Sequence, residues 1–295
     1  MEKQEQESYI KAGKIASQVV EYAKSFIKKD MLLIEIAEKI DAQIEKLGAK
    51  PAFPVNLSLN EVAAHYTPGL HDTTTATGIL KVDLGVEVNG FIADTAFSLD
   101  LTDNREFKEI IQLNEKALDN VLQNIHQDMK VSEIGKTIQE SIKNSKFNVI
   151  KNLSGHSLSQ DQIHAGLTIS NYDNANPIKL NNMAIAIEPF LTTGVGEVYE
   201  SSPSEIYMLQ EDRKIRDNDA RKILEFIKQN YKTRPFCKRW LEKKSFPKLN
   251  FSLSIMTKQG ILHNFPVLVE KSKKPVSQAE HTILITDKVT VTTKQ

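Results

Sequence analysis

Four acidic residues stand in or beside short apolar segments of this chain. Asp83 lies in KVDLG, Asp94 lies in IADTAF, Glu188 ends MAIAIE, and Glu280 comes just before the apolar run TILI. Such runs are typical of buried strands, where an ionised carboxylate is rarely found without a partner of opposite charge. The four acids therefore indicate one shared site rather than four solvated positions.

The first two acids belong to a predicted β-hairpin. Asn89-Gly90 is a strong signal for a two-residue turn, and it separates two alternating runs of apolar residues. If residues 88 and 91 pair across this turn, Asp83 faces Ala96 and has Asp94 as a diagonal neighbour on the same face, about 7–8 Å away. One face of the hairpin would then carry both acids, and the other would be an apolar layer for helices.

The charge of these acids favours metal ions as their partners. Four carboxylates contribute a charge of −4, which two divalent cations would cancel. Paired metal ions are an established means of activating water for hydrolysis. Carboxylates with imidazole and without thiolate suit manganese, iron, cobalt or zinc, and the sequence does not choose among them.

The chain also repeats a pattern of helices and loops at an interval of about 98 residues. Amphipathic helices are predicted over about 10–27 and 31–48, and their apolar positions return 98 residues downstream. An Asn-Leu-Ser tripeptide precedes His65, and the same tripeptide precedes His164. Each copy would thus supply one such histidine and two carboxylates to a common centre.

We therefore predict an α/β fold built from one domain, residues 1–295, with pseudo-repeats at about 1–100 and 101–295. The second copy is longer because residues 203–262 separate its strands. This segment has helix-like spacing and the basic run KRWLEKK, so we expect an inserted helical subdomain. Two interpretations of it are a lid packed on one side of the domain and a docking surface.

Composition argues against several classes of protein, among them nucleic-acid-binding, secreted and membrane-spanning proteins. The 295 residues include 38 Lys+Arg and 38 Asp+Glu, which argues against binding nucleic acid through a global positive field. No apolar run is long enough for a signal peptide or a membrane span. Cys237 is the single cysteine, which excludes an intramolecular disulfide and a cysteine-built zinc site. These features predict an intracellular protein.

Several segments together resemble the signature blocks of type II methionine aminopeptidases, which belong to the pita-bread metallopeptidases. The matching blocks are FPVNLSLNEVAAHYTP, LKVDLGVEVNGFIADTAFS, LSGHSLSQDQIHAG, AIAIEPF and AEHTILIT. The resemblance covers residues 8–290 and includes the helical insertion that is typical of type II. It implies two pseudo-symmetric halves around a mainly antiparallel sheet. Without a long charged N-terminal extension, the chain is more similar to the archaeal form than to the eukaryotic one.

The resemblance also implies a role for each candidate residue. It implies two divalent metal ions held by Asp83, Asp94, His156, Glu188 and Glu280. In that scheme Asp94 and Glu280 bridge both ions, Asp83 binds one, and His156 and Glu188 bind the other. It further implies contacts with substrate and oxyanion by His65 and His164, proton transfer by Glu188, and a methionine pocket lined by Phe53 and Ile163.

The activity implied by this resemblance is removal of the initiator methionine from nascent proteins with a small second residue, by hydroxide attack at a dinuclear metal centre. It implies a cytoplasmic monomer that acts on nascent N-termini, with the ribosome as a candidate partner and with neither a membrane nor a specific nucleic acid. One departure is the segment EVYES after Gly196, where the eukaryotic pattern has a histidine near the pocket rim.

Two alternatives remain at this point. A proline-specific peptidase of the same superfamily would generally have a separate domain before the metal-binding half, and the first acid here is already at position 83. A catalytically inactive binding protein on the same fold would be expected to lose metal ligands, and here all ligand positions are filled.

Overall fold

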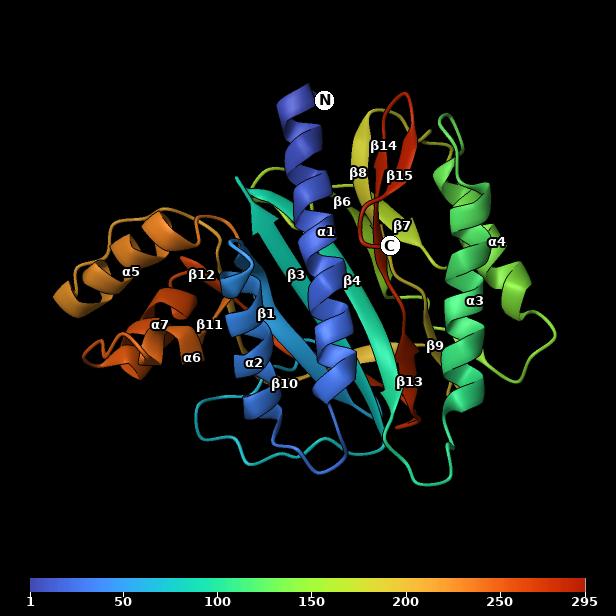
Figure 1. The fold of residues 1–295 in the computed structure, drawn as a ribbon. Coiled ribbons are helices and arrows are strands. Elements are labelled where there is room, and N and C mark those ends of the chain that lie inside the picture. Colours follow the sequence, from blue (N-terminus) through green and yellow to red (C-terminus); the bar gives the residue numbers. More distant parts are fainter. Residues whose placement is uncertain (295) are drawn as a thin grey trace.

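The computed structural model describes residues 1–294, and its first half is a sheet covered by two helices (Figure 1). Both helices lie where the apolar spacing predicts them. The elements of this half are α1 (Lys3–Phe26), α2 (Leu33–Lys46), β1 (Lys50–Leu59), β2 (Val62–Ala64), β3 (Ile79–Val88) and β4 (Phe91–Asp100).

The second half repeats this order of two helices followed by strands. Its elements are α3 (Lys108–Asn124), α4 (Val131–Ile142), β5 (Asn148–Val149), β6 (Ser154–Leu158), β7 (Thr168–Ser170), β8 (Met183–Ile187), β9 (Phe190–Thr192), β13 (Val276–Gln278), β14 (His281–Ile285) and β15 (Val289–Val291). Between β9 and β13 the chain adds β10 (Val198–Leu209), α5 (Asn218–Asn230), β11 (Phe236–Cys237), α6 (Lys238–Glu242), α7 (Leu249–Lys258) and β12 (Leu262–Glu270).

The strands pair antiparallel, in sheets ordered β1-β3-β4, β11-β10-β12-β2, β13-β9-β5 and β15-β14-β8-β6-β7. The predicted hairpin register is confirmed, because Asp83 pairs with Ala96 and Val88 pairs with Phe91. Asn89 and Gly90 both have positive φ, 55° and 87°, as this tight turn requires. The mixed α/β architecture agrees with the sequence prediction.

The two halves meet where β4 runs beside the segment that leads into β14. Glu280 donates its backbone N–H to the Ala96 carbonyl at 2.9 Å, and Asp94 donates its own to the Thr282 hydroxyl at 2.8 Å. Ser98 donates its hydroxyl to the Gln278 carbonyl at 2.7 Å. These bonds join β4 of the first half to residues 278–282 of the second half, so residues of both halves are held side by side at this junction.

Apolar packing between helices and strands holds each half together on the side that faces away from the junction. Helix α1 lies against the outer face of β3 and β4, α2 lies against β1, and α3 and α4 cover the strands of the second half (Figure 1). Leu80, Val82, Leu84 and Val86 of β3 are fully buried against the first pair of helices. The opposite face of β3 and β4 is therefore left to carry the acids.

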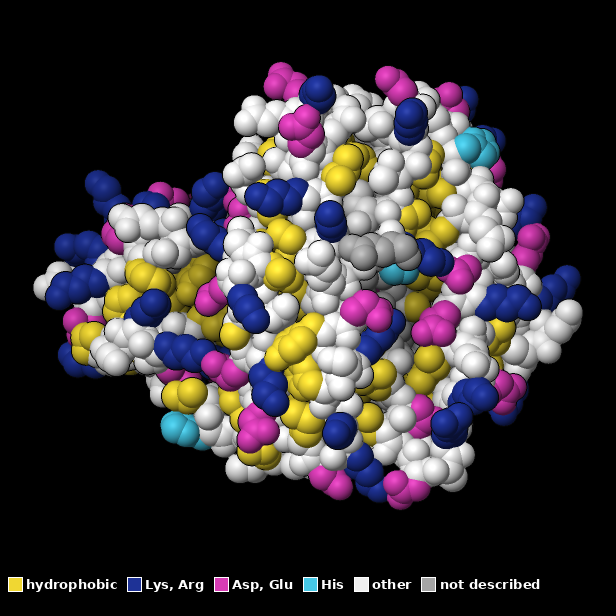
Figure 2. Space-filling view, viewed as in Figure 1, with side chains coloured by type: hydrophobic (Ala, Val, Ile, Leu, Met, Phe, Trp, Pro, Cys, Tyr) yellow, Lys and Arg dark blue, Asp and Glu magenta, His cyan; other side chains and the backbone are white. Residues whose placement is uncertain are grey.

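Charged side chains of both signs are mixed over the face shown in Figure 2, in keeping with the net charge of zero. Within residues 1–294 there is no helix that combines the length and the apolar character needed to cross a membrane.

Helices α5, α6 and α7 form a lobe beside the first half, with its own apolar core (Figure 1). These helices span residues 218–258, within the expected insertion. The lobe contacts α2 through Arg239, which is fully buried. Its Nη2 donates to Asp41 at 3.1 Å and its Nη1 donates to the Pro68 carbonyl at 2.6 Å, while Trp240 Nε1 also donates to Asp41 at 2.8 Å.

Replacing Arg239 with Ala should lower the free energy of unfolding by about 3–5 kcal/mol, because Asp41 would remain buried without its charged partner. Urea unfolding measures this change. The double variant Arg239→Leu, Asp41→Leu should recover much of the loss, since no buried charge is left unpaired. A loss below about 1 kcal/mol in the single variant would show that this contact does not anchor the lobe.

Candidate metal centre

The four predicted acids converge at the junction of the two halves. Asp83 comes from β3, Asp94 from β4, Glu188 directly follows β8, and Glu280 directly precedes β14. Asp94 and Glu280 are buried, with 3% and 2% of their surface exposed. Their backbones are brought together by the bonds between β4 and residues 280–282 described above.

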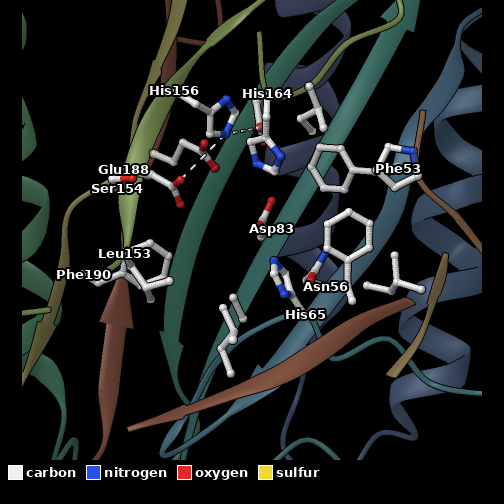
Figure 3. A pocket seen from close by; sticks show the side chains of 18 of the residues that line it. Phe53, Asn56, His65, Asp83, Leu153, Ser154, His156, His164, Glu188 and Phe190 are labelled. Carbon is white, nitrogen blue, oxygen red and sulfur yellow. Dashed lines mark ion pairs between the residues drawn. The ribbon is translucent and has the colours of Figure 1, made fainter. Parts of the chain in front are cut away.

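His156 of β6 completes the cluster. One ligand atom from each of Asp94, His156 and Glu280 can be chosen so that all three lie within 4.8 Å of one another. His156 Nε2 is 3.6 Å from Asp94 Oδ2 and 3.7 Å from Glu188 Oε1, and Figure 3 shows this ring above Asp83 and Glu188. The structure thus brings together all five residues of the predicted ligand set.

Burial dominates the electrostatics of the centre. It raises the pKa of Asp83 to about 7 and raises the pKa of Asp94, Glu188 and Glu280 well above their ordinary values, with mutual repulsion adding to the shift of these last three. Burial also lowers the pKa of His156 to about 3, so its imidazole is neutral at pH 7, the form that binds metals.

The polar atoms of this cluster fit a divalent cation. Within residues 1–294, none of the following buried atoms has a hydrogen-bond partner: Asp83 Oδ1, Asp94 Oδ1, Glu280 Oε2 and His156 Nδ1. Buried polar atoms are nearly always hydrogen-bonded, so a group of unpartnered carboxylate oxygens in one place calls for a positive partner. Carboxylate oxygens and neutral imidazole are suitable donors for a divalent transition metal.

Gln278 is a member of this site that the sequence analysis missed. Its buried Nε2 donates to Asp83 Oδ2 at 3.3 Å and to Glu188 Oε2 at 3.4 Å. One amide therefore holds carboxylates from the two halves and fixes the direction of their other oxygens. The sequence offered one weak signal, because residues at i and i+2 of an extended segment share a face, and Gln278 stands two positions before Glu280.

His65 and His164 line a cavity of about 210 Å³ together with Asp83, Asp94 and Glu280. His65 Nδ1 lies 3.1 Å from the Pro266 carbonyl, and burial lowers its pKa to about 4. Burial also lowers the pKa of His164, whose ring lies edge-on to His156 at 4.4 Å between centroids. Both imidazoles are therefore neutral at pH 7.

Apolar residues form the rest of this cavity. Phe53 and Ile163, both predicted, line it. Further lining residues, which the sequence analysis did not identify, are Leu153, Phe190, Ile206, Pro235, Phe265 and Leu268. Ile206, Pro235 and Phe265 come from the inserted segment or its flanking strands, so no local pattern places them here. The Phe53 ring needs Gly85 beside it, since a Cβ on Gly85 would lie 2.2 Å from that ring.

Asp83→Asn should stabilise the protein measured in the presence of a chelator. Between pH 3.8, the ordinary pKa of an aspartate, and about pH 7, Asp83 is protonated in the folded wild type but ionised in the unfolded chain. Wild-type stability therefore falls as the pH rises through this window, and the variant escapes that loss. Thermal unfolding should show the advantage of the variant at pH 8 and no advantage below pH 4.

The same variant should gain less stability than the wild type from added Mn²⁺, because a ligand that binds the folded state stabilises it more when it binds more tightly, with the logarithm of its affinity. Glu133→Gln, a change at an exposed helical residue, is the matched control. Equal Mn²⁺ stabilisation of wild type and Asp83→Asn would contradict the role of Asp83 at a metal site.

The chain is similar in sequence to known proteins over nearly its whole length. The chain is 43% identical over 291 residues to a methionine aminopeptidase of Pyrococcus horikoshii, covering 97% of this chain and 98% of that protein. It is 41% identical over 298 residues to a methionine aminopeptidase of Methanocaldococcus jannaschii, covering 100% of both.

Solved structures share the fold. A methionine aminopeptidase from Thermotoga maritima has a TM-score of 0.71 at 20% identity, covering 100% of this chain and 98% of that chain. A prolidase from Pyrococcus furiosus has a TM-score of 0.62 at 19% identity, covering 100% of this chain and 65% of that chain. These two similarities show the common fold alone. Residues 7–287 match metallopeptidase family M24, and the chain belongs to this family.

Proposed function

We propose that this protein is a metal-dependent aminopeptidase that removes N-terminal methionine from polypeptides. The observation that carries the proposal is a buried cluster of four carboxylates and a neutral imidazole that borders an apolar cavity. The high identity to methionine aminopeptidases over the full chain supports the same conclusion. Nascent chains are the natural source of such substrates, which would place the protein in the cytoplasm, near ribosomes.

The donor set supports two divalent ions. Four carboxylates carry a charge of −4 when ionised, which two divalent cations neutralise, and the donors suit manganese, iron, cobalt or zinc. Asp94 and Glu280, which face one another across the junction of the halves, would be the ligands shared by the two ions. When bound, such ions polarise a scissile carbonyl and lower the pKa of water, which supplies the electrophile and the nucleophile for hydrolysis.

The apolar wall of the cavity would hold the methionine side chain. Phe53 and Ile163 provide this wall beside His164, and Asp83 lies at the polar end. A flexible thioether packs well against aromatic rings, and its sulfur gains from contact with a ring edge. With the side chain held there, the free α-amine of the substrate lies toward the negative charge of the carboxylates, which favours a chain terminus over an internal residue.

The two histidines would have different tasks. The Pro266 carbonyl can only accept a hydrogen bond, so the neutral His65 ring carries its hydrogen on Nδ1 and leaves Nε2 as an acceptor. His65 can therefore bind an N–H of the substrate. His164 has no such constraint, and its ring N–H can donate to the oxygen of the scissile carbonyl as negative charge develops there.

Glu188 is the candidate for moving the proton. Its carboxylate would take a proton from the attacking water and give it to the leaving amine. Gln278 donates to its Oε2, and its Oε1 lies 3.7 Å from His156 Nε2.

Metal-stripped protein should hydrolyse Met-Ala-Ser only after a divalent metal is added back, with Mn, Fe, Co and Zn tested separately. Asp94→Ala should abolish this activity, because the shared ligand of the site is lost. Xaa-Pro dipeptides are the control substrates, and hydrolysis of these in preference to Met-Ala-Ser would identify a proline-specific peptidase instead. Near-wild-type activity of Asp94→Ala would refute the assignment of the centre.

His164→Ala should lower kcat for Met-Ala-Ser about 10²–10³-fold, the usual effect of removing one oxyanion donor, with a much smaller change in KM. Steady-state kinetics on the metal-loaded protein measures both constants. His126→Ala, at an exposed position outside the cavity, is the matched control. A change confined to KM would show that His164 only binds the substrate.

A further inference from the structure

A tight turn at residues 159–162 stands directly before the pocket residues Ile163 and His164. Ser159 and Gln162 exchange backbone hydrogen bonds of 3.0 and 3.1 Å across it. Asp161 adopts a left-handed conformation with φ of 57°, which is unusual for a residue other than glycine. The conformation of this turn sets the direction in which the chain enters the pocket wall.

Three consecutive residues of the inserted segment hold Asp161. Lys232 Nζ lies 2.6 Å from Asp161 Oδ2, and the Thr233 hydroxyl donates to the Asp161 carbonyl at 2.6 Å. Arg234 Nε lies 3.4 Å from the remaining carboxylate oxygen, Oδ1. We call residues 232–234 the Asp161 clamp. Both its charges and its hydrogen bonds converge on a single turn of the second half.

Arg234 also joins this turn to the first half. Its Nη1 donates to Glu87 Oε2 at 2.5 Å, and Glu87 Oε1 accepts from the Gly90 N–H at 2.5 Å. The side chains of Arg234 and Glu87 are only 5% and 9% exposed. Asp161 in turn donates its N–H to the Gly90 carbonyl at 2.8 Å. The β3–β4 turn, the Asp161 turn and the insertion are therefore fixed to one another.

The next residue, Pro235, lines the same cavity as Ile163 and His164. We propose that the Asp161 clamp is a positioning element of the active site, through which the insertion sets the places of Ile163 and His164 relative to Phe53. This role rests on the proposed function. It acts through contacts with Asp161 and Glu87, and no residue of the clamp is catalytic.

The chemistry of the clamp suits positioning better than simple anchoring of the lobe. The apolar core of the lobe and the buried Arg239–Asp41 contact already attach it to the rest of the protein. The buried guanidinium of Arg234 has a fixed geometry, because its planar fork of N–H groups donates to Glu87 Oε2 and to the Tyr231 and Asn230 carbonyls while it lies 3.4 Å from Asp161 Oδ1. Displacing a pocket residue by about 1 Å can lower activity about 100-fold.

The test compares Asp161→Asn, Arg234→Gln and Arg234→Lys with wild type in two measurements. The first is the NMR signal of the His164 ring in uniformly histidine-labelled, metal-free protein, assigned with His164→Gln. The second is kcat and KM for Met-Ala-Ser and Leu-Ala-Ser after metal loading. Asp217→Ala is the matched control, because it removes the N-cap of α5 and loosens the lobe without touching the Asp161 turn.

We expect Arg234→Gln and Asp161→Asn to shift or broaden the His164 signal and to lower kcat/KM for Met-Ala-Ser about 10–100-fold. The ratio of Met to Leu hydrolysis should also fall about 10-fold as the pocket loses its shape. Arg234→Lys, which keeps the charge but not the fork, should be intermediate. Asp217→Ala should leave the His164 signal and the Met-to-Leu ratio as in wild type.

The proposal is overturned if folded Asp161→Asn and Arg234→Lys both keep the wild-type His164 signal. It is also overturned if Asp217→Ala changes that signal and the Met-to-Leu ratio as much as the clamp variants do, since the effect would then be a general loosening. If wild type hydrolyses neither peptide, the proposed function fails, while the His164 signal still tests the clamp. Should Arg234→Gln not fold, the other two variants decide the question.

Discussion

The repulsion among four carboxylates buried at one junction is the constraint on which this structure depends. Asp83 and Asp94 come from the first half, Glu188 and Glu280 from the second, and the strands that carry them are fixed by backbone bonds such as that between Glu280 and Ala96. The acids cannot separate without breaking the contact between the halves. Burial then raises their pKa values, so the arrangement opposes folding unless positive charge compensates it. Because the fold holds these carboxylates close together in apolar surroundings, cations should bind strongly between them.

Local patterns in the sequence predicted the parts of the fold that local forces determine. The Asn-Gly turn and a period of two fix the β3–β4 register, and with it the placement of Asp83 opposite Ala96. The amphipathic spacing of α1 and α2 likewise predicts their buried faces. Convergence of the four acids was also within reach, because the chain carries the same helix, loop and strand pattern twice.

The remaining parts of the site depend on contacts between segments that are distant in the sequence. Gln278 reaches Asp83 across 195 positions, and Pro235 lines the cavity from within the insertion. No pattern marks Pro235, and Gln278 is marked only by its position two residues before Glu280. The tautomer of His65 has the same origin, since it follows from the Pro266 carbonyl, 201 positions away. Contacts of this kind form only when the two halves and the insertion pack together, so they cannot be predicted from local sequence.

The insertion contacts the loops next to both histidines of the cavity. Arg234 and Arg239 are both buried and five positions apart; Arg239 contacts the first half, and Arg234 contacts both halves. Arg239 donates to the Pro68 carbonyl, in the loop that follows His65, whereas Arg234 contacts the turn that precedes His164. The loop after His65 and the turn before His164 are thus both held by residues 234–239 of the insertion. Buried guanidinium contacts are costly to break, so residues 234–239 hold both of these loops against the insertion. A chain without the insertion would have to hold both loops through contacts within and between the two halves alone.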